Sequence, residues 1–318
     1  MVARRAASQA PVRLYRAVTV PELRRLLLVG LDPKLRVKLR ELPRWEGLDI
    51  RERTLSAADV NEGRFLVLQQ TLPGTERVYE LVIEDICADL ATVNDSAQAL
   101  EATARALGRW EAFFQEHGLD GLSSQAERGL FGELWLLREK LAAKVGQQLA
   151  HSSWTGYSRT NHDFQLESSA LEVKTTTGRQ PHEVRITSER QLDNQGLNHL
   201  FLFVLVLGEL QSGGVTLPRL VAQIRSDLDA EPMTKAELER KLIRVGYLDA
   251  HRDRYSTGYV VRAVRCYSVE SGFPRILESD LTEGIGDVAY TLSLAACAAF
   301  VRDTDEALNT VSQGINQA

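Results

Sequence analysis

The chain is 318 residues long, with 44% hydrophobic and 25% charged residues and a formal net charge of -5. These values are typical of a globular protein with room for two domains, and the negative charge disfavours any nucleic-acid site that is not local. The longest apolar runs, at 200–207 and 288–301, are shorter than the roughly 18 residues of a membrane-spanning helix. Because no apolar segment near the start resembles a secretory signal, we predict a cytoplasmic protein without a membrane span.

The first part of the chain mixes short apolar segments with turns. We predict extended segments at 36–42 and 64–71. The segment at 78–90 fits a strand followed by a helix, and its periodicity does not separate the two. No chemical motif lies in this part, so residues 1–95 are interpreted as an α+β accessory region.

Two helices are predicted next. The first covers about 96–118, and the second begins at a capping box of Ser124 and Glu127 and carries its apolar stripe to Leu141. At about 100° per residue, Glu133 falls at the margin of that stripe. A buried carboxylate is costly unless it is paired. Glu133 therefore either reaches the rim or an arginine, or points inward as a metal ligand.

A polar loop at 147–161 leads into a predicted hairpin at His162–Thr176. Apolar residues alternate on both of its arms, as in half-buried strands. The alternation places Glu172 and Lys174 on one face, with Asp163 on the partner arm. The spacing alone leaves two interpretations open, a solvated cross-strand salt bridge or a functional site.

The rest of the chain predicts further strands and helices. A buried strand is predicted at 200–207, where the apolar run is continuous. The other predicted elements are strands at 183–187, 217–224 and 259–269, helices at 188–192 and 234–246, a strand leading into a helix at 288–301, and a frayed tail from residue 304. The order predicts an α/β domain over 96–318, with a core at about 96–210 and an α+β extension at about 215–318.

Several chemistries lack their sequence signatures. The chain contains no P-loop, no dinucleotide-binding glycine motif, no G-x-S-x-G elbow and no H-E-x-x-H pair. Its three cysteines form no C-x-x-C pair, which excludes a zinc ribbon and indicates free thiols. What remains is the glutamate of the second helix with the charged residues of the hairpin.

Asp163, eight intervening residues and then Glu172-Val173-Lys174, preceded by a helical glutamate, resemble the PD-(D/E)XK nuclease superfamily. The segments 129–134, 188–192 and 272–274 further resemble an uncharacterised bacterial PD-(D/E)XK family found in restriction and phage-defence gene neighbourhoods. One residue departs from the superfamily pattern. His162 precedes Asp163 where the superfamily is named for a proline.

The resemblance implies a fold and a function. It implies a restriction-endonuclease-like core, in which a mixed sheet is flanked by helices, and a DNA endonuclease that depends on Mg²⁺, for which Mn²⁺ substitutes. It also implies a restriction or phage-defence system, with an ATPase, helicase or methyltransferase as partner. A homodimer is expected because two symmetry-related sites cut both strands most simply.

The resemblance also implies roles for named residues. Two carboxylates that hold Mg²⁺ open to water can neutralise the charge that develops during phosphodiester hydrolysis. The expected metal ligands are Asp163, Glu172, the Val173 carbonyl and Glu133, the last directly or through water. Lys174 would orient or help deprotonate the attacking water and stabilise the transition state. Gln191 would hold the phosphate or the lysine.

Two alternatives remain. A nuclease-fold subunit that binds nucleic acid or a partner protein without cutting would share the fold. A purely structural hairpin would place the Glu133 carboxyl on the order of 10 Å or more from the other carboxyls, beyond a shared ion's reach. Local basic density at Arg179, Arg185 and Arg190 is the group that we expect to contact phosphate.

Overall fold

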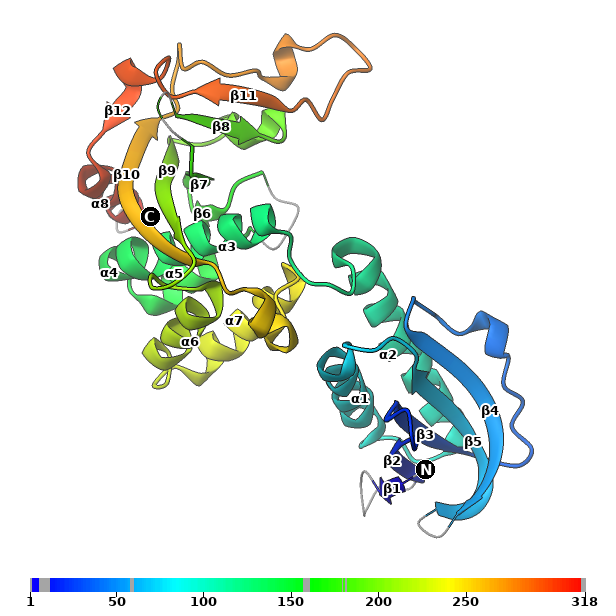
Figure 1. The fold of residues 1–318 in the computed structure, drawn as a ribbon. Coiled ribbons are helices and arrows are strands. Elements are labelled where there is room, and N and C mark those ends of the chain that lie inside the picture. Colours follow the sequence, from blue (N-terminus) through cyan, green and yellow to red (C-terminus); the bar gives the residue numbers. More distant parts are fainter. Residues whose placement is uncertain are drawn as a thin grey trace. The chain divides into compact units, whose positions relative to one another are not determined.

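The computed structural model describes residues 2–5, 12–57, 60–156, 161–178, 180 and 182–315. Its contacts divide the chain into two compact units, residues 1–121 and 122–318 (Figure 1). The division follows helix α2 (Ser96–His117), whereas the sequence places the boundary at residue 95. Helix α2 belongs to the first unit because its buried face packs against α1 (Glu76–Leu90) and β3 (Arg25–Leu31).

The first unit is an antiparallel sheet with two helices packed on it. Its strand order is β1-β2-β3-β5-β4. The remaining elements are β1 (Val2–Arg5), β2 (Leu14–Val18), the 3₁₀ turn η1 (Leu39–Glu41), β4 (Leu48–Ala57) and β5 (Val60–Gln70). The predicted strand at 64–71 is confirmed, and 78–90 is helical. The expected strand at 36–42 is wrong, because η1 lies there.

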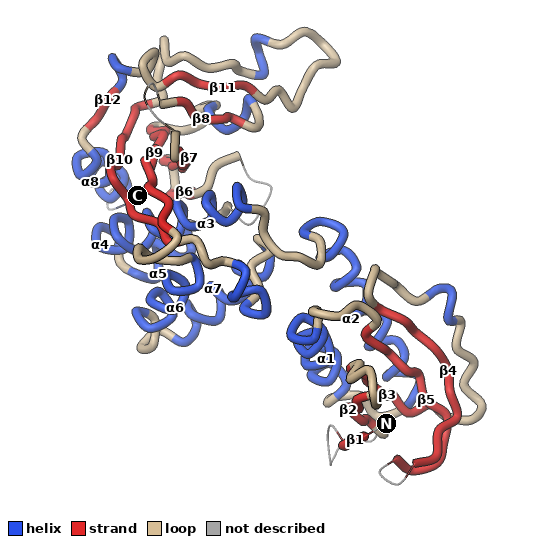
Figure 2. The backbone as a smooth tube through the Cα atoms, viewed as in Figure 1, coloured by secondary structure: helices blue, strands red, loops and turns tan. Residues whose placement is uncertain are grey.

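The second unit contains a mixed sheet of order β12-β10-β9-β7-β6, in which β7 and β9 are parallel and the other pairs antiparallel. Figure 2 shows β9 and β10 side by side in this sheet. The strands are β6 (Phe164–Leu166), β7 (Ser169–Thr176), β9 (His199–Leu210), β10 (Gly258–Ser268) and β12 (Val301–Arg302). Strand β9 is buried over most of its length, as its apolar run predicts.

Helices cover one face of this sheet. Their apolar side chains form one core with Leu171, Val173 and Phe203. The elements on this side are α3 (Ser124–Leu136), a π-helical turn (Leu137–Leu141), α4 (Ala142–Val145), α5 (Gln147–Ser153), α6 (Leu217–Asp227), α7 (Pro232–Arg244), the 3₁₀ turn η4 (Asp249–Arg254) and α8 (Thr304–Ile315).

The opposite face of the sheet is covered by a small two-stranded sheet. Strands β8 (Glu183–Ile186) and β11 (Tyr290–Ser293) pair with each other and pack on Leu202 and Val204 of β9. The short turns on this side are η3 (Glu189–Leu192), η5 (Glu278–Asp280) and η6 (Ala298–Phe300). The expected mixed sheet flanked by helices is thus confirmed as an α/β fold.

Three sequence expectations in this unit are corrected. The predicted strand at 217–224 is helix α6, because Thr216 caps its first turn and a proline occupies that turn. The predicted loop at 147–161 contains α5. The tail from residue 304 is helix α8, with Leu308 and Val311 buried. Strand β10, in the part predicted as an α+β extension, pairs with β9 in the same sheet as the predicted core.

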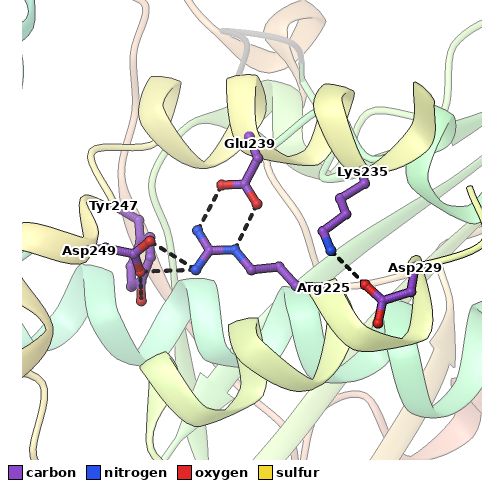
Figure 3. Close-up of polar contacts among 6 residues, drawn as sticks. All are labelled: Arg225, Asp229, Lys235, Glu239, Tyr247 and Asp249. Carbon is purple, nitrogen blue, oxygen red and sulfur yellow. Dashed lines mark hydrogen bonds and ion pairs between the residues drawn. The ribbon is translucent and has the colours of Figure 1, made fainter. Parts of the chain in front are cut away.

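Polar contacts join helices α6 and α7. Arg225 on α6 makes a two-bond ion pair with Glu239 on α7 at 2.7 Å and also pairs with Asp249 (Figure 3). Lys235 on α7 pairs with Asp229 at 2.7 Å. The Arg225–Glu239 pair fixes α7 against α6, and the Lys235–Asp229 pair fixes the start of α7 against the loop before it.

Neither a membrane span nor a disulfide is found in the described part of the chain. None of its helices is both long and apolar enough to cross a bilayer. Cys87, Cys266 and Cys297 are free, and the last two are buried. The expectation of free thiols is confirmed.

Candidate active site

The predicted hairpin is confirmed as β6 and β7. Its pairs are Phe164 with Leu171, Gln165 with Ala170, and Leu166 with Ser169. The turn includes Glu167, which lies in the left-handed region with φ 48°. Because β6 ends its pairing at Leu171, the following residues of β7 have an edge that β6 does not cover.

Asp163 lies at that uncovered edge. One of its carboxyl oxygens accepts a hydrogen bond from the Val173 backbone N–H at 2.7 Å. The Asp163 carbonyl accepts hydrogen bonds from the N–H groups of Thr155, at 2.8 Å, and Gly156, at 3.1 Å. The C=O of a strand residue points to the same side as its N–H. The Val173 carbonyl, an expected ligand, therefore faces the side where Asp163 lies.

Glu172 and Lys174 share the face of β7 opposite the helices. Leu171 and Val173 pack into the helical core, so alternation directs their neighbours to the other face. The Lys174 ammonium lies 2.6 Å from Oε1 of Glu172. It also donates to Oε1 of Gln191 at 3.1 Å. The Glu172 side chain is 1% exposed and the Lys174 side chain 16% exposed, so the pair is not a solvated salt bridge.

Gln191 is held by its own surroundings. Its side-chain oxygen accepts hydrogen bonds from both the backbone N–H and the hydroxyl of Thr187. Ser188 caps the η3 turn that carries it. Of its two expected roles, the geometry matches contact with the lysine.

Glu133 approaches from the helical side of the sheet. Helix α3 comes close to β7 because Gly132 leaves no side chain between them; a Cβ there would collide with the Thr175 methyl group. Oε2 of Glu133 accepts a hydrogen bond from the Trp154 indole N–H at 2.9 Å. The glutamate is thus aimed at the β7 edge and does not reach outward to solvent.

The position of Gly156 measures how close the two carboxyls lie. A Cβ built there would be 2.5 Å from Oε2 of Glu133 and 3.3 Å from Oδ1 of Asp163. Two atoms that both lie within 3.3 Å of one point cannot be separated by the order of 10 Å that a purely structural hairpin predicts. The structure therefore contradicts that alternative.

Burial raises the pKa of all three carboxyls, and Asp163 adds to the increase at Glu133 and Glu172. Burial, and then Asp163, raise the pKa of Glu133 well above its ordinary value and that of Glu172 to about 8. Burial also raises the pKa of Asp163, against the opposing effects of Lys174 and the Val173 N–H. Burial alone would lower the pKa of Lys174, but the carboxylates raise it. The lysine is therefore a charged donor at neutral pH, and not a base, when no metal is bound.

The donor atoms fit a hard divalent cation. Oε2 of Glu172 is buried and accepts no hydrogen bond, which is costly unless a cation or proton occupies it. Within the described ranges, no three His, Cys, Asp or Glu side chains are close enough together to enclose an ion. Mg²⁺ needs no such cage, since one or two carboxylates with several waters hold it. Asp163 and Glu172 can supply that pair, with the Val173 carbonyl and Glu133 beside them.

The basic group beyond the hairpin is only partly placed. Arg179 lies outside the described residues. Arg185 is exposed on β8. Arg190 lies 3.6 Å from both Glu189 and Glu278, so it already has acidic neighbours.

Sequence reasoning missed residues that shape the site through tertiary contacts. Trp154 binds Glu133, and the backbone N–H groups of Thr155 and Gly156 hold Asp163, although all three fall in the segment expected to be a loop. The pairing of this segment with the hairpin begins at a bridge between Trp154 and Phe164. The only sequence signal for these contacts is the presence of a tryptophan and a glycine, Trp154 and Gly156, just before the hairpin.

A family model matches residues 1–295, and its description reads “Putative PD-(D/E)XK family member” (DUF4420). No curated protein and no solved structure matches the chain.

Proposed function

The chain belongs to this PD-(D/E)XK family, and on that premise we propose that it is a Mg²⁺-dependent DNA endonuclease, in which Mn²⁺ can substitute. The observation that carries the proposal is the arrangement at the free edge of β7. There Lys174 lies 2.6 Å from Glu172 and within the field of Asp163 and Glu133. Buried acidic groups that can hold a cation, beside one lysine, can stabilise the charge that develops during hydrolysis of an anionic ester.

Asp163 and Glu172 are the proposed ligands of the cation, with the Val173 carbonyl and Glu133 completing the set. When bound, the cation would neutralise charge on the phosphate and lower the pKa of water. The Val173 N–H holds the Asp163 carboxylate, and the Trp154 indole orients Glu133. These contacts position ligands before substrate arrives.

Lys174 is the proposed electrostatic catalyst. A lysine side chain ordinarily carries a charge at neutral pH, so the ammonium can donate to a phosphate oxygen and to the attacking water, which it orients. Gln191 accepts from the ammonium at 3.1 Å and fixes its direction. Because Thr187 in turn fixes the Gln191 oxygen, the ammonium is held with little freedom to turn away.

DNA is the proposed substrate, and the cytoplasm is therefore the proposed location. The family resemblance supports a role in restriction or phage defence, with an ATPase, helicase or methyltransferase as partner. The chain has no P-loop, so ATP-driven movement along DNA would need such a partner. We also propose a homodimer, since two copies of one site cut both strands most simply.

The proposal is tested by cleavage of supercoiled plasmid with Mg²⁺, Mn²⁺ or EDTA. Wild-type protein should cut with either metal and not with EDTA, and Asp163→Asn should be inactive. Arg219→Gln is a surface control on α6, outside both the carboxylate set and the basic group at Arg179, Arg185 and Arg190. Cutting by Asp163→Asn at the wild-type rate would refute the site.

The assay also separates the proposal from a nuclease-fold subunit that does not cut. Such a subunit would bind DNA in a gel-shift assay but leave the plasmid intact with both metals, including after addition of the neighbouring gene products. Metal-dependent cutting that is lost in Asp163→Asn would exclude it.

A further inference from the structure

We propose that Lys241, on helix α7, is a positioning residue for the carboxylate site. The inference deepens the proposed function and rests on it for its significance. Lys241 is only 3% exposed. It belongs to the C-terminal part of the chain, far in sequence from the hairpin, and carries no part of the PD-(D/E)XK motif.

The Lys241 ammonium binds the segment that supports the site. It donates to the carbonyl oxygens of His151 at 2.5 Å and Trp154 at 2.9 Å, with that of Ser152 at 3.3 Å. These carbonyls lie at and beyond the end of helix α5, where C=O groups lack partners within the helix. One cation therefore gathers the end of the helix and the start of the next segment. Glu237, one turn earlier on α7, balances its charge at 2.8 Å.

The segment held by Lys241 contacts both sides of the proposed metal site. The Trp154 indole donates to Glu133, and the next two residues donate their N–H groups to the Asp163 carbonyl. The Trp154 carbonyl, which accepts from Lys241, therefore lies within two residues of the indole and of both N–H groups. If that carbonyl moves, the indole and the two N–H groups move with it.

Burying an ammonium carries a large cost in free energy for a contact that is purely structural. Removing a lysine from water costs free energy that good hydrogen bonds must offset. Lys235, on the same helix, shows the contrast. Its side chain is 36% exposed and pairs with Asp229 near the start of α7 (Figure 3). Among the described residues, the Lys235 ammonium pairs with Asp229 and makes no hydrogen bond or ion pair with segment 151–156, so it serves as a matched control.

The first test measures geometry and needs no activity. The chain has four tryptophans, so ¹⁵N-indole labelling of the full-length protein gives few signals, and Trp154→Phe identifies that of Trp154. In metal-free Lys241→Met we expect the Trp154 indole resonance to shift or broaden. In Lys235→Met it should stay at the wild-type position. An unshifted resonance in folded Lys241→Met would overturn the inference.

The second test measures Mn²⁺ affinity by electron paramagnetic resonance. Loss of residues that orient metal ligands typically weakens binding by roughly 10- to 100-fold. We expect a loss in that range for Lys241→Met, no change for Lys235→Met, and recovery in Lys241→Arg. Adding Trp154→Phe to Lys241→Met should cost little more, because both act through one contact. Fully additive losses would contradict the proposed route.

The two proposals fail in different ways. If wild-type protein neither binds Mn²⁺ nor cuts DNA, the proposed function is wrong, while the indole resonance still decides whether Lys241 positions Trp154. If wild-type protein binds Mn²⁺ and Lys241→Met binds it equally well, only the role of Lys241 is wrong. Should Lys241→Met not fold, Lys241→Gln carries the same expectations, since its shorter neutral amide cannot reach all the carbonyls.

Discussion

Replacing Gly156 by alanine should damage the site while sparing the fold. The new Cβ would lie 2.5 Å from Oε2 of Glu133, where real Cβ contacts are not below 3.0 Å, so the two must separate by at least about 0.5 Å. Metal ligands tolerate only about 0.2 Å. The Glu133 carboxylate is the end of a flexible side chain and Gly156 is exposed. We therefore expect the clash to be removed by movement of the carboxylate. We expect Mn²⁺ affinity to fall by roughly 10- to 100-fold, about 1.4 to 2.7 kcal/mol.

The matched control for this change is Gly129→Ala. Gly129 lies one helical turn before Glu133, and an added Cβ there meets nothing within 4 Å. Alanine in a helix should leave Mn²⁺ affinity unchanged and stabilise the protein by up to about 1 kcal/mol. Affinity is measured by electron paramagnetic resonance and stability by urea unfolding. Wild-type Mn²⁺ affinity in Gly156→Ala would refute the geometry that we assign to Glu133.

Three further predictions concern packing, pH and the lysine. Gly132→Ala should lower the free energy of unfolding by about 1–3 kcal/mol in urea, because its Cβ would push α3 from Thr175; unchanged stability would contradict the close contact. The pKa of Glu172, raised to about 8, means that the metal-free folded state retains a proton that the unfolded state loses, so stability should fall as pH rises from about 5 to 8. Thermal unfolding should show a smaller loss of stability over this pH range in Glu172→Gln than in wild type. An equal loss in the two proteins would contradict the raised pKa of Glu172. Lys174→Met should reduce plasmid cleavage by roughly 10²- to 10³-fold while Mn²⁺ binding is retained, and cleavage near the wild-type rate would exclude Lys174 as the electrostatic catalyst.

Local patterns predicted the strands and helices that carry the site. Alternation in 162–176 identified the hairpin and the shared face of Glu172 and Lys174, since both follow from the two-residue period of a strand. The continuous apolar run predicted β9, because a strand that is buried on both faces does not alternate. Segment 217–224 was misassigned as a strand because a short apolar run fits either structure. Its capping threonine and first-turn proline were the decisive signals for helix α6.

Tertiary contacts explain what the sequence could not predict. Glu133 was selected by its place on a helical wheel, but its partner, Trp154, lies in a segment that carries no periodic pattern. Lys241 and Lys235 are indistinguishable by local sequence, yet one is buried on backbone carbonyls and the other is at the surface. The contacts that place helix α2 in the first unit, with α1 and β3, are likewise tertiary, and the boundary predicted at residue 95 does not include them.

The central claim is that Asp163 and Glu172 hold a divalent cation at the free edge of β7. Crystals soaked in Mn²⁺ and measured for anomalous scattering test it most directly. We predict an anomalous peak bonded to both carboxylates at roughly 2.1–2.2 Å, and its loss in Asp163→Asn. A wild-type crystal with no peak there, or with Mn²⁺ bound only elsewhere, would contradict the account.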